Sequence, residues 1–209
     1  MNIVLFADFQ CPFCYTGETA LQEAIKELGI EDQVYLDIKS REIHRPEDGD
    51  GQMPMLEIFQ QKEGFSPEGA AKHVEKINAM GKNDAGLDFD FAKVHESSDH
   101  DAHRLYKLAR DKGLGQAFRD AIHEAYFTNH EILADWDVLK KAAKKAGLDE
   151  ELVNRALEEG WYENEVKNDE VEYEALKIES IPYCIIDQEV FPDHFSKESA
   201  IEALKRHMK

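Results

Sequence analysis

Two cysteines separated by two residues, Cys11 and Cys14, are the side chains of this sequence best suited to chemistry. A thiol pair at this spacing can close a small disulfide ring or present a thiolate to a disulfide in a partner. The pair follows an apolar segment and precedes an amphipathic one, which predicts a strand-to-helix turn. The positive end of such a helix favours a negative charge on Cys11, which makes it the attacking thiol. Cys14, almost one turn further on, is then the more buried, resolving thiol.

Two other interpretations of the pair remain open at this point. Two cysteines can form half of a zinc site, for which Cys184 and a histidine would have to supply the remaining ligands, or they can be purely structural. Because the sequence holds no second paired motif, thiol–disulfide chemistry is favoured and no metal site is predicted. Pro12 fits the first turn of a helix, where its missing N–H has no helical acceptor.

The elements that would position the pair form a strand–helix–strand unit. Residues 2–8 are rich in Ile, Val, Leu and Phe and predict a buried strand. Apolar residues at helical spacing then continue until Gly29, which predicts the end of a helix. Residues 34–38 predict a second strand, and the length of the crossover suits a parallel pair.

The middle of the chain, residues 53–160, has helical patterns throughout. Ser66 followed by proline predicts the start of one helix, which Gly81 would end. Ser98 with Asp101 resembles a capping box at the start of another helix. Asp135 and Asp149 are expected to cap two more helices, which end at Gly147 and Gly160.

The last part of the chain predicts a helix over 161–178, two strands joined at Asp187-Gln188, and a final helix capped by Ser196. The predicted fold is therefore α/β, with a mixed central sheet flanked by helices and an all-α insertion. We expect residues 1–52 and 161–209 to form one split domain and residues 53–160 to form the inserted helical domain.

Pro182 lies inside an apolar, strand-like run, where proline is tolerated at a strand start or in a special turn. A cis peptide bond between Ile181 and Pro182 would explain its place and leave backbone groups of Ile181 free to bind an extended polypeptide. An ordinary strand-initiating proline is the alternative.

These motifs together resemble the DsbA family of the thioredoxin fold, and more narrowly its FrnE-like branch of dithiol–disulfide isomerases. The resemblance lies in the start Asp8 to Gly17 (DFQCPFCYTG), in Gly86 to Asp90 and Asp101 to Leu105 of the helical block, and in the Ile-Pro loop. It covers nearly the whole chain. It implies a thioredoxin-like fold and a disulfide oxidoreductase in which Cys11 attacks, Cys14 resolves and Pro182 lies in cis opposite them.

Three features depart from the family pattern. One is the stretch Asp193-His194-Phe195-Ser196 before the last helix, where family members often have a small-residue Gly-Ala-Gln turn. Phe13 stands where the branch commonly has Trp and where strong periplasmic oxidants have His. Since Phe13 cannot stabilise a thiolate as His does, we expect a less oxidising pair. Cys184 stands where an apolar residue is usual, and it is either a small buried hydrophobe or a third thiol near the pair.

The net charge of 25 − 44 = −19 argues against nucleic-acid binding, because a polyanion would be repelled. No segment is apolar and long enough to be a signal peptide or to cross a membrane, so we expect a cytoplasmic protein. Eleven acidic and three basic residues between 150 and 179 are expected to form a solvated face. His100 and His103 lie three residues apart, a spacing that metal sites use, but near a helix start we expect them to be solvated. His123 is expected to have no special role.

We therefore predict a cytoplasmic thiol–disulfide oxidoreductase or isomerase that uses Cys11 and Cys14 on protein or small-thiol disulfides. Pro12, Phe13, Ile181 and Pro182 would support the site, and no cofactor is expected. Neither the direction of electron flow nor the oligomeric state is predicted. Two alternatives stay open: a thioredoxin-fold adaptor or redox-sensing interaction protein, and a glutathione-dependent enzyme. The intact pair of cysteines counts against the second, a class that typically has Ser at the attacking position.

Overall fold

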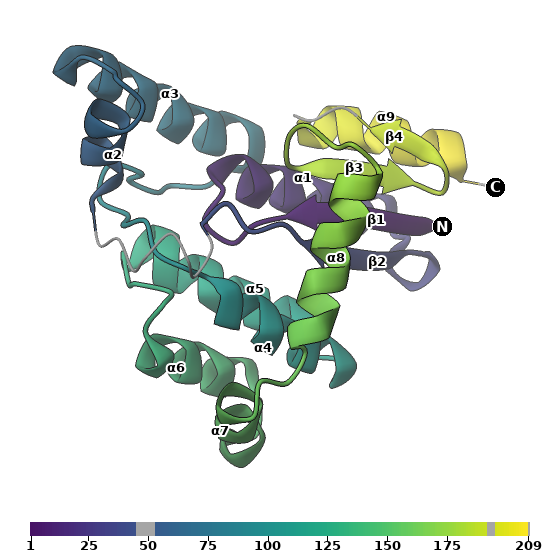
Figure 1. Ribbon diagram of the computed structural model, residues 1–209. Coiled ribbons are helices and arrows are strands. Elements are labelled where there is room, and N and C mark those ends of the chain that lie inside the picture. The colour runs from purple at the N-terminus through teal and green to yellow at the C-terminus, as the bar shows by residue number, and fades with distance from the viewer. Residues whose placement is uncertain (45–52, 192–194, 209) are drawn as a thin grey trace.

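The computed structural model of the protein describes residues 1–44, 53–191 and 195–208 (Figure 1). Within them, a mixed four-stranded sheet has the order β2-β1-β3-β4. β1 and β2 are parallel, while β3 runs antiparallel to β1 and β4 antiparallel to β3. The predicted mixed sheet is confirmed. Its strands are β1 (Asn2–Ala7), β2 (Tyr35–Ser40), β3 (Tyr183–Ile186) and β4 (Glu189–Phe191).

Helices cover both faces of this sheet and extend beyond it on two sides (Figure 1). They are α1 (Pro12–Leu28), α2 (Met55–Gln61), α3 (Pro67–Ala85), α4 (His100–Asp111), α5 (Gly115–His123), α6 (Trp136–Ala146), α7 (Glu150–Glu158), α8 (Glu163–Ala175) and α9 (Lys197–His207), with a 3-10 turn at Glu31–Gln33 and a π turn at Glu124–Thr128.

Alternate residues of β1 enter two different cores, as the period of a strand requires. Leu5 is fully buried in the main core together with Leu21 of α1. Phe6 points to the other face, where it packs with Tyr173 of α8 and Ile178. The sheet therefore lies between α1 and α9, which pack together on one side, and α8 on the other (Figure 1).

The helical segment α4 is tied to this sheet by a buried ion pair. Lys107 of α4 is 1% exposed, pairs with Asp169 of α8 and donates to the backbone oxygen of Ile38 in β2 at 3.2 Å. Asp169 also accepts from the backbone N–H of Ser40 at 2.9 Å. One lysine thus joins three elements that lie far apart in the sequence.

Several predicted helix ends are confirmed. Gly29 and Gly147 end α1 and α6 in the left-handed conformation, with φ of 62° and 91°. The side chains of Asp135, Asp149 and Ser196 accept hydrogen bonds from the first turns of α6, α7 and α9.

Two predicted helix ends are wrong. α3 continues through Gly81 to Ala85, because Gly81 does not adopt the left-handed conformation that ends a helix. Gly81 instead makes room for a ring, since an added Cβ would lie 2.6 Å from Cε1 of Phe89. The helix ends instead at Gly86, whose φ is 65°. α4 has no capping box from Ser98, since its N-cap is Asp99 and the Asp99 side chain makes no capping hydrogen bond.

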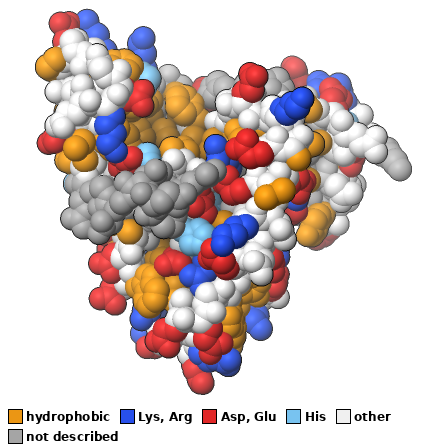
Figure 2. Space-filling view, viewed as in Figure 1, with side chains coloured by type: hydrophobic (Ala, Val, Ile, Leu, Met, Phe, Trp, Pro, Cys, Tyr) orange, Lys and Arg blue, Asp and Glu red, His pale blue; other side chains and the backbone are white. Residues whose placement is uncertain are grey.

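Several carboxylates of the acidic stretch between 150 and 179 form ion pairs with basic side chains from other elements, which a purely solvated face would not do. Arg41 binds Glu170 with an N–O distance of 2.6 Å, and Arg110 binds Glu165 at 3.1 Å. Figure 2 shows red and blue side chains interspersed over α8 rather than one continuous negative surface.

The division into domains at 1–52, 53–160 and 161–209 stays a prediction, and its first boundary falls among residues outside the described ranges. No helix of the described part of the chain is long and apolar enough to span a bilayer.

Candidate active site

The two cysteines lie at the turn from β1 into α1, as predicted. Cys11 is the N-cap of α1 in an extended conformation, and Pro12 occupies the first helical position. The backbone N–H of Cys14 donates to the sulfur of Cys11 at 3.3 Å. The Cys11 sulfur thus caps the positive end of a 17-residue helix, a place that favours negative charge.

The environments of the two sulfurs differ. Both cysteines are free thiols, with residue exposures of 4% for Cys11 and 1% for Cys14. Burial raises the pKa of Cys14 well above its usual value. The hydrogen bond with Cys11 and the negative charge of the Cys11 sulfur add to the effect. Phe13, between them, is 38% exposed. An apolar ring therefore marks the surface beside the thiols.

The structure brings the Ile181-Pro182 loop to the same helix. The Ile181–Pro182 peptide bond is cis. Pro182 is buried against α1 at Gly17, where an added Cβ would lie 3.4 Å from Pro182 Cγ and 3.3 Å from Cζ of Phe195. The absence of a side chain at Gly17 thus lets Pro182 and Phe195 approach the helix that begins at Cys11.

Cys184 lies within the sheet. It is fully buried in β3, opposite Leu5 of β1 and Phe191 of β4. Burial raises the pKa of its thiol to about 12. Its surroundings are those of a small hydrophobic core residue.

Asp8 connects the end of β1 to the cysteine turn. Its backbone oxygen accepts from the N–H of Cys11 at 3.4 Å, and its carboxylate accepts from the N–H groups of Gln10 at 2.6 Å and Ile43 at 2.7 Å. Burial raises the pKa of Asp8 to about 7, with the charge of Glu42 acting in the same direction and the backbone hydrogen bonds opposing it. Asp8 is thus part of the support of the turn.

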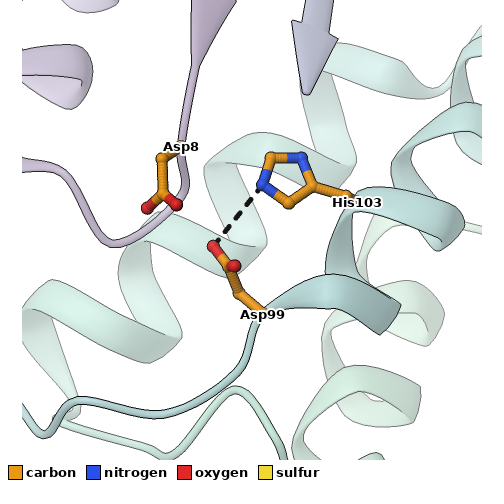
Figure 3. Close-up of side chains that lie close together, drawn as sticks. All are labelled: Asp8, Asp99 and His103. Carbon is orange, nitrogen blue, oxygen red and sulfur yellow. Dashed lines mark ion pairs between the residues drawn. The ribbon is translucent and has the colours of Figure 1, made fainter. Parts of the chain in front are cut away.

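A cluster that the sequence analysis missed lies beside Asp8. Asp99 and His103, at the start of α4, point into the same buried space (Figure 3). Burial raises the pKa of Asp99, and burial lowers the pKa of His103. His103 is 2% exposed, so the expectation that it is solvated is wrong. The spacing of Asp99 and His103, one helical turn apart, was the available signal.

His100 also differs from the expectation of a solvated side chain, while the expectation for His123 is not contradicted. His100 bridges Glu42 and Glu163 with N–O distances of 2.6 and 2.7 Å, and its hydrogen bond to Glu42, helped by the one to Glu163, raises its pKa to about 9. His123 is buried against Tyr15, with ring centres 4.2 Å apart. Burial lowers the pKa of His123 to about 3, and Arg119 adds to the effect.

Comparison with known proteins agrees with this architecture. Residues 2–208 match the family described as the DSBA-like thioredoxin domain. The chain is 25% identical over 213 residues to the uncharacterized protein YwbO of Bacillus subtilis, covering 100% of this chain and 98% of that protein.

Solved structures give the same result. The probable DsbA oxidoreductase SCO1869 of Streptomyces coelicolor is 27% identical, with a TM-score of 0.89 over 99% of this chain and 89% of that one. The cytosolic disulfide reductase DsbM of Pseudomonas aeruginosa shares the fold, at 16% identity and a TM-score of 0.64, over 99% and 98% of the two chains.

The predicted thioredoxin-like fold is therefore confirmed, while the FrnE-like branch stays a prediction. A thiol pair at a strand-to-helix turn, the matching fold and a family match over almost the whole length lead to one conclusion. The chain belongs to the DSBA-like thioredoxin domain family, the family of the DsbA-type thiol–disulfide oxidoreductases.

Proposed function

We propose that the protein transfers electrons between thiols and disulfides with Cys11 as the attacking and Cys14 as the resolving thiol. The observation that carries the proposal is the position of the Cys11 sulfur, at the N-cap of α1 with the Cys14 N–H directed at it. A positive helix end and one N–H donor favour a negative charge there. Only a thiolate attacks a disulfide, so the first step belongs to Cys11.

The reaction then proceeds in two exchanges. The Cys11 thiolate attacks one sulfur of the substrate disulfide, which forms a mixed disulfide and releases the other substrate sulfur as a thiolate. Cys14 gives up its proton and attacks the Cys11 sulfur, so the Cys11–Cys14 disulfide forms and the second substrate sulfur leaves. The substrate gains two electrons, the protein loses two, and the Cys14 proton ends on a substrate thiol.

The raised pKa of Cys14 supports this order. A thiol that keeps its proton does not compete with Cys11 for the incoming disulfide. It becomes the attacking group only after the mixed disulfide has formed beside it. Cys11 therefore carries out the first exchange, with the substrate, and Cys14 the second, with the mixed disulfide.

The substrates we propose are polypeptide or low-molecular-weight disulfides, and the compartment is the cytoplasm. The exposed ring of Phe13 lies beside the thiols, and the half-buried Ile181 precedes Pro182, which packs on Gly17 of the same helix, so both offer apolar surface to a substrate. The DsbM relative is described as cytosolic and has also been solved with GSH, so glutathione is the small thiol to test first. The direction of the reaction depends on the reduction potential, for which 30 mV corresponds to about 1.4 kcal/mol.

Replacement of each thiol tests the proposal. Cys11→Ser is expected to abolish the reduction of insulin by the protein with glutathione as the electron source. Cys14→Ser is expected to accumulate a mixed disulfide at Cys11, visible by mass spectrometry under non-reducing conditions. Unchanged turnover in the Cys11 variant would overturn the proposal and favour an adaptor that binds partners without thiol chemistry.

A further inference from the structure

Three buried side chains, Asp8, Asp99 and His103, direct one ligand atom each into a common space (Figure 3). The three atoms lie within 4.8 Å of one another. Asp8 comes from the end of β1, and the other two come from the start of α4. Two elements that lie about a hundred residues apart in the sequence thus build one polar site.

Two of the three side chains of this site, Asp99 and His103, have polar atoms that lack hydrogen-bond partners in the described part of the chain, whereas both carboxylate oxygens of Asp8 accept backbone N–H groups. Neither carboxylate oxygen of Asp99 has a hydrogen bond of ordinary geometry to a described residue, and neither does Nε2 of His103. Asp99 is 0% and His103 2% exposed. Buried polar groups are almost always satisfied by protein, water or an ion. Asp99 is, in addition, the N-cap of α4, yet its carboxylate turns inward instead of capping the helix.

Asp99 and His103, drawn as an ion pair in Figure 3, are spaced more widely than a hydrogen bond requires. Oδ2 of Asp99 lies 3.6 Å from Nε2 of His103, too far for a hydrogen bond. Ligand atoms at metal distances of about 2.0–2.2 Å around a tetrahedral ion lie about 3.4 Å apart. The 3.6 Å between Oδ2 of Asp99 and Nε2 of His103 is close to this ligand–ligand distance.

His100 provides the contrast within the same chain. It also lies between two carboxylates, Glu42 and Glu163, but at 2.6 and 2.7 Å, with each ring nitrogen hydrogen-bonded. That histidine is satisfied by its neighbours. Asp99, next to it in the sequence, and His103, one turn on, are not.

The charge of the site favours a cation. Asp8 and Asp99 are two carboxylates in one buried space, and the carboxylate of Glu42 repels both of them. Asp8 and His103 also line a small cavity with Arg119 and His123, so packed side chains do not close the site on every side. Two carboxylate oxygens and one imidazole nitrogen form a ligand set that suits Zn²⁺ and related divalent ions.

We propose that Asp8, Asp99 and His103 bind one divalent transition-metal cation of the Zn²⁺ class, with water completing its coordination. The site is separate from the thiol chemistry, since neither sulfur is a ligand. It adjoins that chemistry through the backbone of Asp8, which holds the N–H of Cys11. A metal here would fix the end of β1 to the start of α4.

The test uses the full chain with Cys11 and Cys14 oxidised to a disulfide, so that the thiol pair cannot bind metal. Zn²⁺ affinity is measured by competition with a chelator, and Co²⁺ is added as a spectroscopic probe. We expect one Zn²⁺ per chain and visible ligand-field bands of Co²⁺ without sulfur-to-metal charge transfer. Asp99→Asn and His103→Gln should each weaken Zn²⁺ binding about tenfold or more. Glu163→Gln, the matched change at the satisfied histidine, should leave the affinity unchanged.

The absence of stoichiometric Zn²⁺ binding to the oxidised protein would overturn the proposal. Equal affinity in the Asp99 and His103 variants would also overturn it. Asp99→Asn keeps the side-chain shape and removes a buried charge, so without metal we expect it to unfold at a temperature no lower than the parent. It should lose the rise in unfolding temperature that Zn²⁺ gives the parent. If one of these variants does not fold, the other carries the test together with Asp8→Asn, and unchanged Zn²⁺ affinity in these would overturn the proposal. The Co²⁺ spectrum of the parent excludes a thiolate site, because sulfur ligands would add charge-transfer bands.

Discussion

The backbone N–H of Cys14 donates a hydrogen bond to the sulfur of Cys11 at 3.3 Å, which makes two neighbouring thiols chemically unequal. The sulfur that accepts this bond caps α1, and the sulfur of Cys14 lies deeper with a raised pKa. The same turn of chain therefore supplies an attacking group and a group held back for the second step.

The three thiols should react in a fixed order with an alkylating reagent. Cys11 should be modified first, and Cys184 last, because at pH 8 a pKa of about 12 leaves on the order of one thiol in ten thousand ionised. Brief treatment with iodoacetamide under native conditions, followed by peptide mass spectrometry, gives the order. Labelling of Cys184 as fast as Cys11 would show an accessible third thiol instead of a core residue. Cys184→Ala is expected to retain reductase activity.

Removal of the buried cation between α4 and α8 should destabilise the protein strongly. Lys107→Met leaves Asp169 without its ion-pair partner, and breaking a buried pair costs about 3–5 kcal/mol. Urea unfolding measures the loss. The control is Lys167→Met, which removes an exposed i,i+4 pair with Glu163 and should cost about 0.5 kcal/mol or less. Equal losses in the two variants would contradict the structural role of Lys107.

Gly81→Ala should leave the protein no more stable than the parent, although alanine is the better helix former. The added methyl would meet the ring of Phe89 at 2.6 and 2.7 Å. Overpacking of this kind costs about 1–3 kcal/mol, which exceeds or offsets the gain of about 1 kcal/mol in helix propensity. Thermal unfolding of the single variant and of Gly81→Ala with Phe89→Leu tests the cause. A single variant more stable than the parent would show that the ring can move aside.

His123 should make the protein less stable in acid. Its pKa is about 3 in the folded protein against an ordinary value of 6.5, so as pH falls the unfolded chain takes up the proton first. The stability that depends on neutral His123 is complete above pH 6.5 and is lost as pH falls toward 3, by up to about 1.4 kcal/mol per pH unit. His123→Gln should remove this part of the slope. Parallel stability curves for parent and variant, measured by urea unfolding between pH 4 and 7, would contradict the prediction.

Features that depend on local sequence were predictable. The cysteine pair at the start of α1, the helix end at Gly29 and the cap at Asp135 each follow from a few adjacent residues. The order of sheet and helices followed from strand-like and helix-like periods together with the family resemblance.

Features that depend on contacts between distant segments were not predictable. Gly81 has the sequence signature of a helix end, but α3 continues past it. The missing side chain of Gly81 instead makes room for the ring of Phe89, eight residues on. Asp99 and His103 lie on the polar start of a helix, and only the packing of α4 against the end of β1 buries them beside Asp8. Burial, not residue type, determined the chemical state of these groups.

The redox equilibrium of the Cys11–Cys14 pair tests the central claim most directly. The protein is equilibrated in buffers of varied reduced and oxidised glutathione, quenched with acid and alkylated, and the two states are quantified by mass spectrometry. We predict one reversible two-electron transition between the dithiol and a Cys11–Cys14 disulfide, which is lost in Cys14→Ser. A pair that stays reduced across the whole range, or that oxidises without returning, would contradict the account.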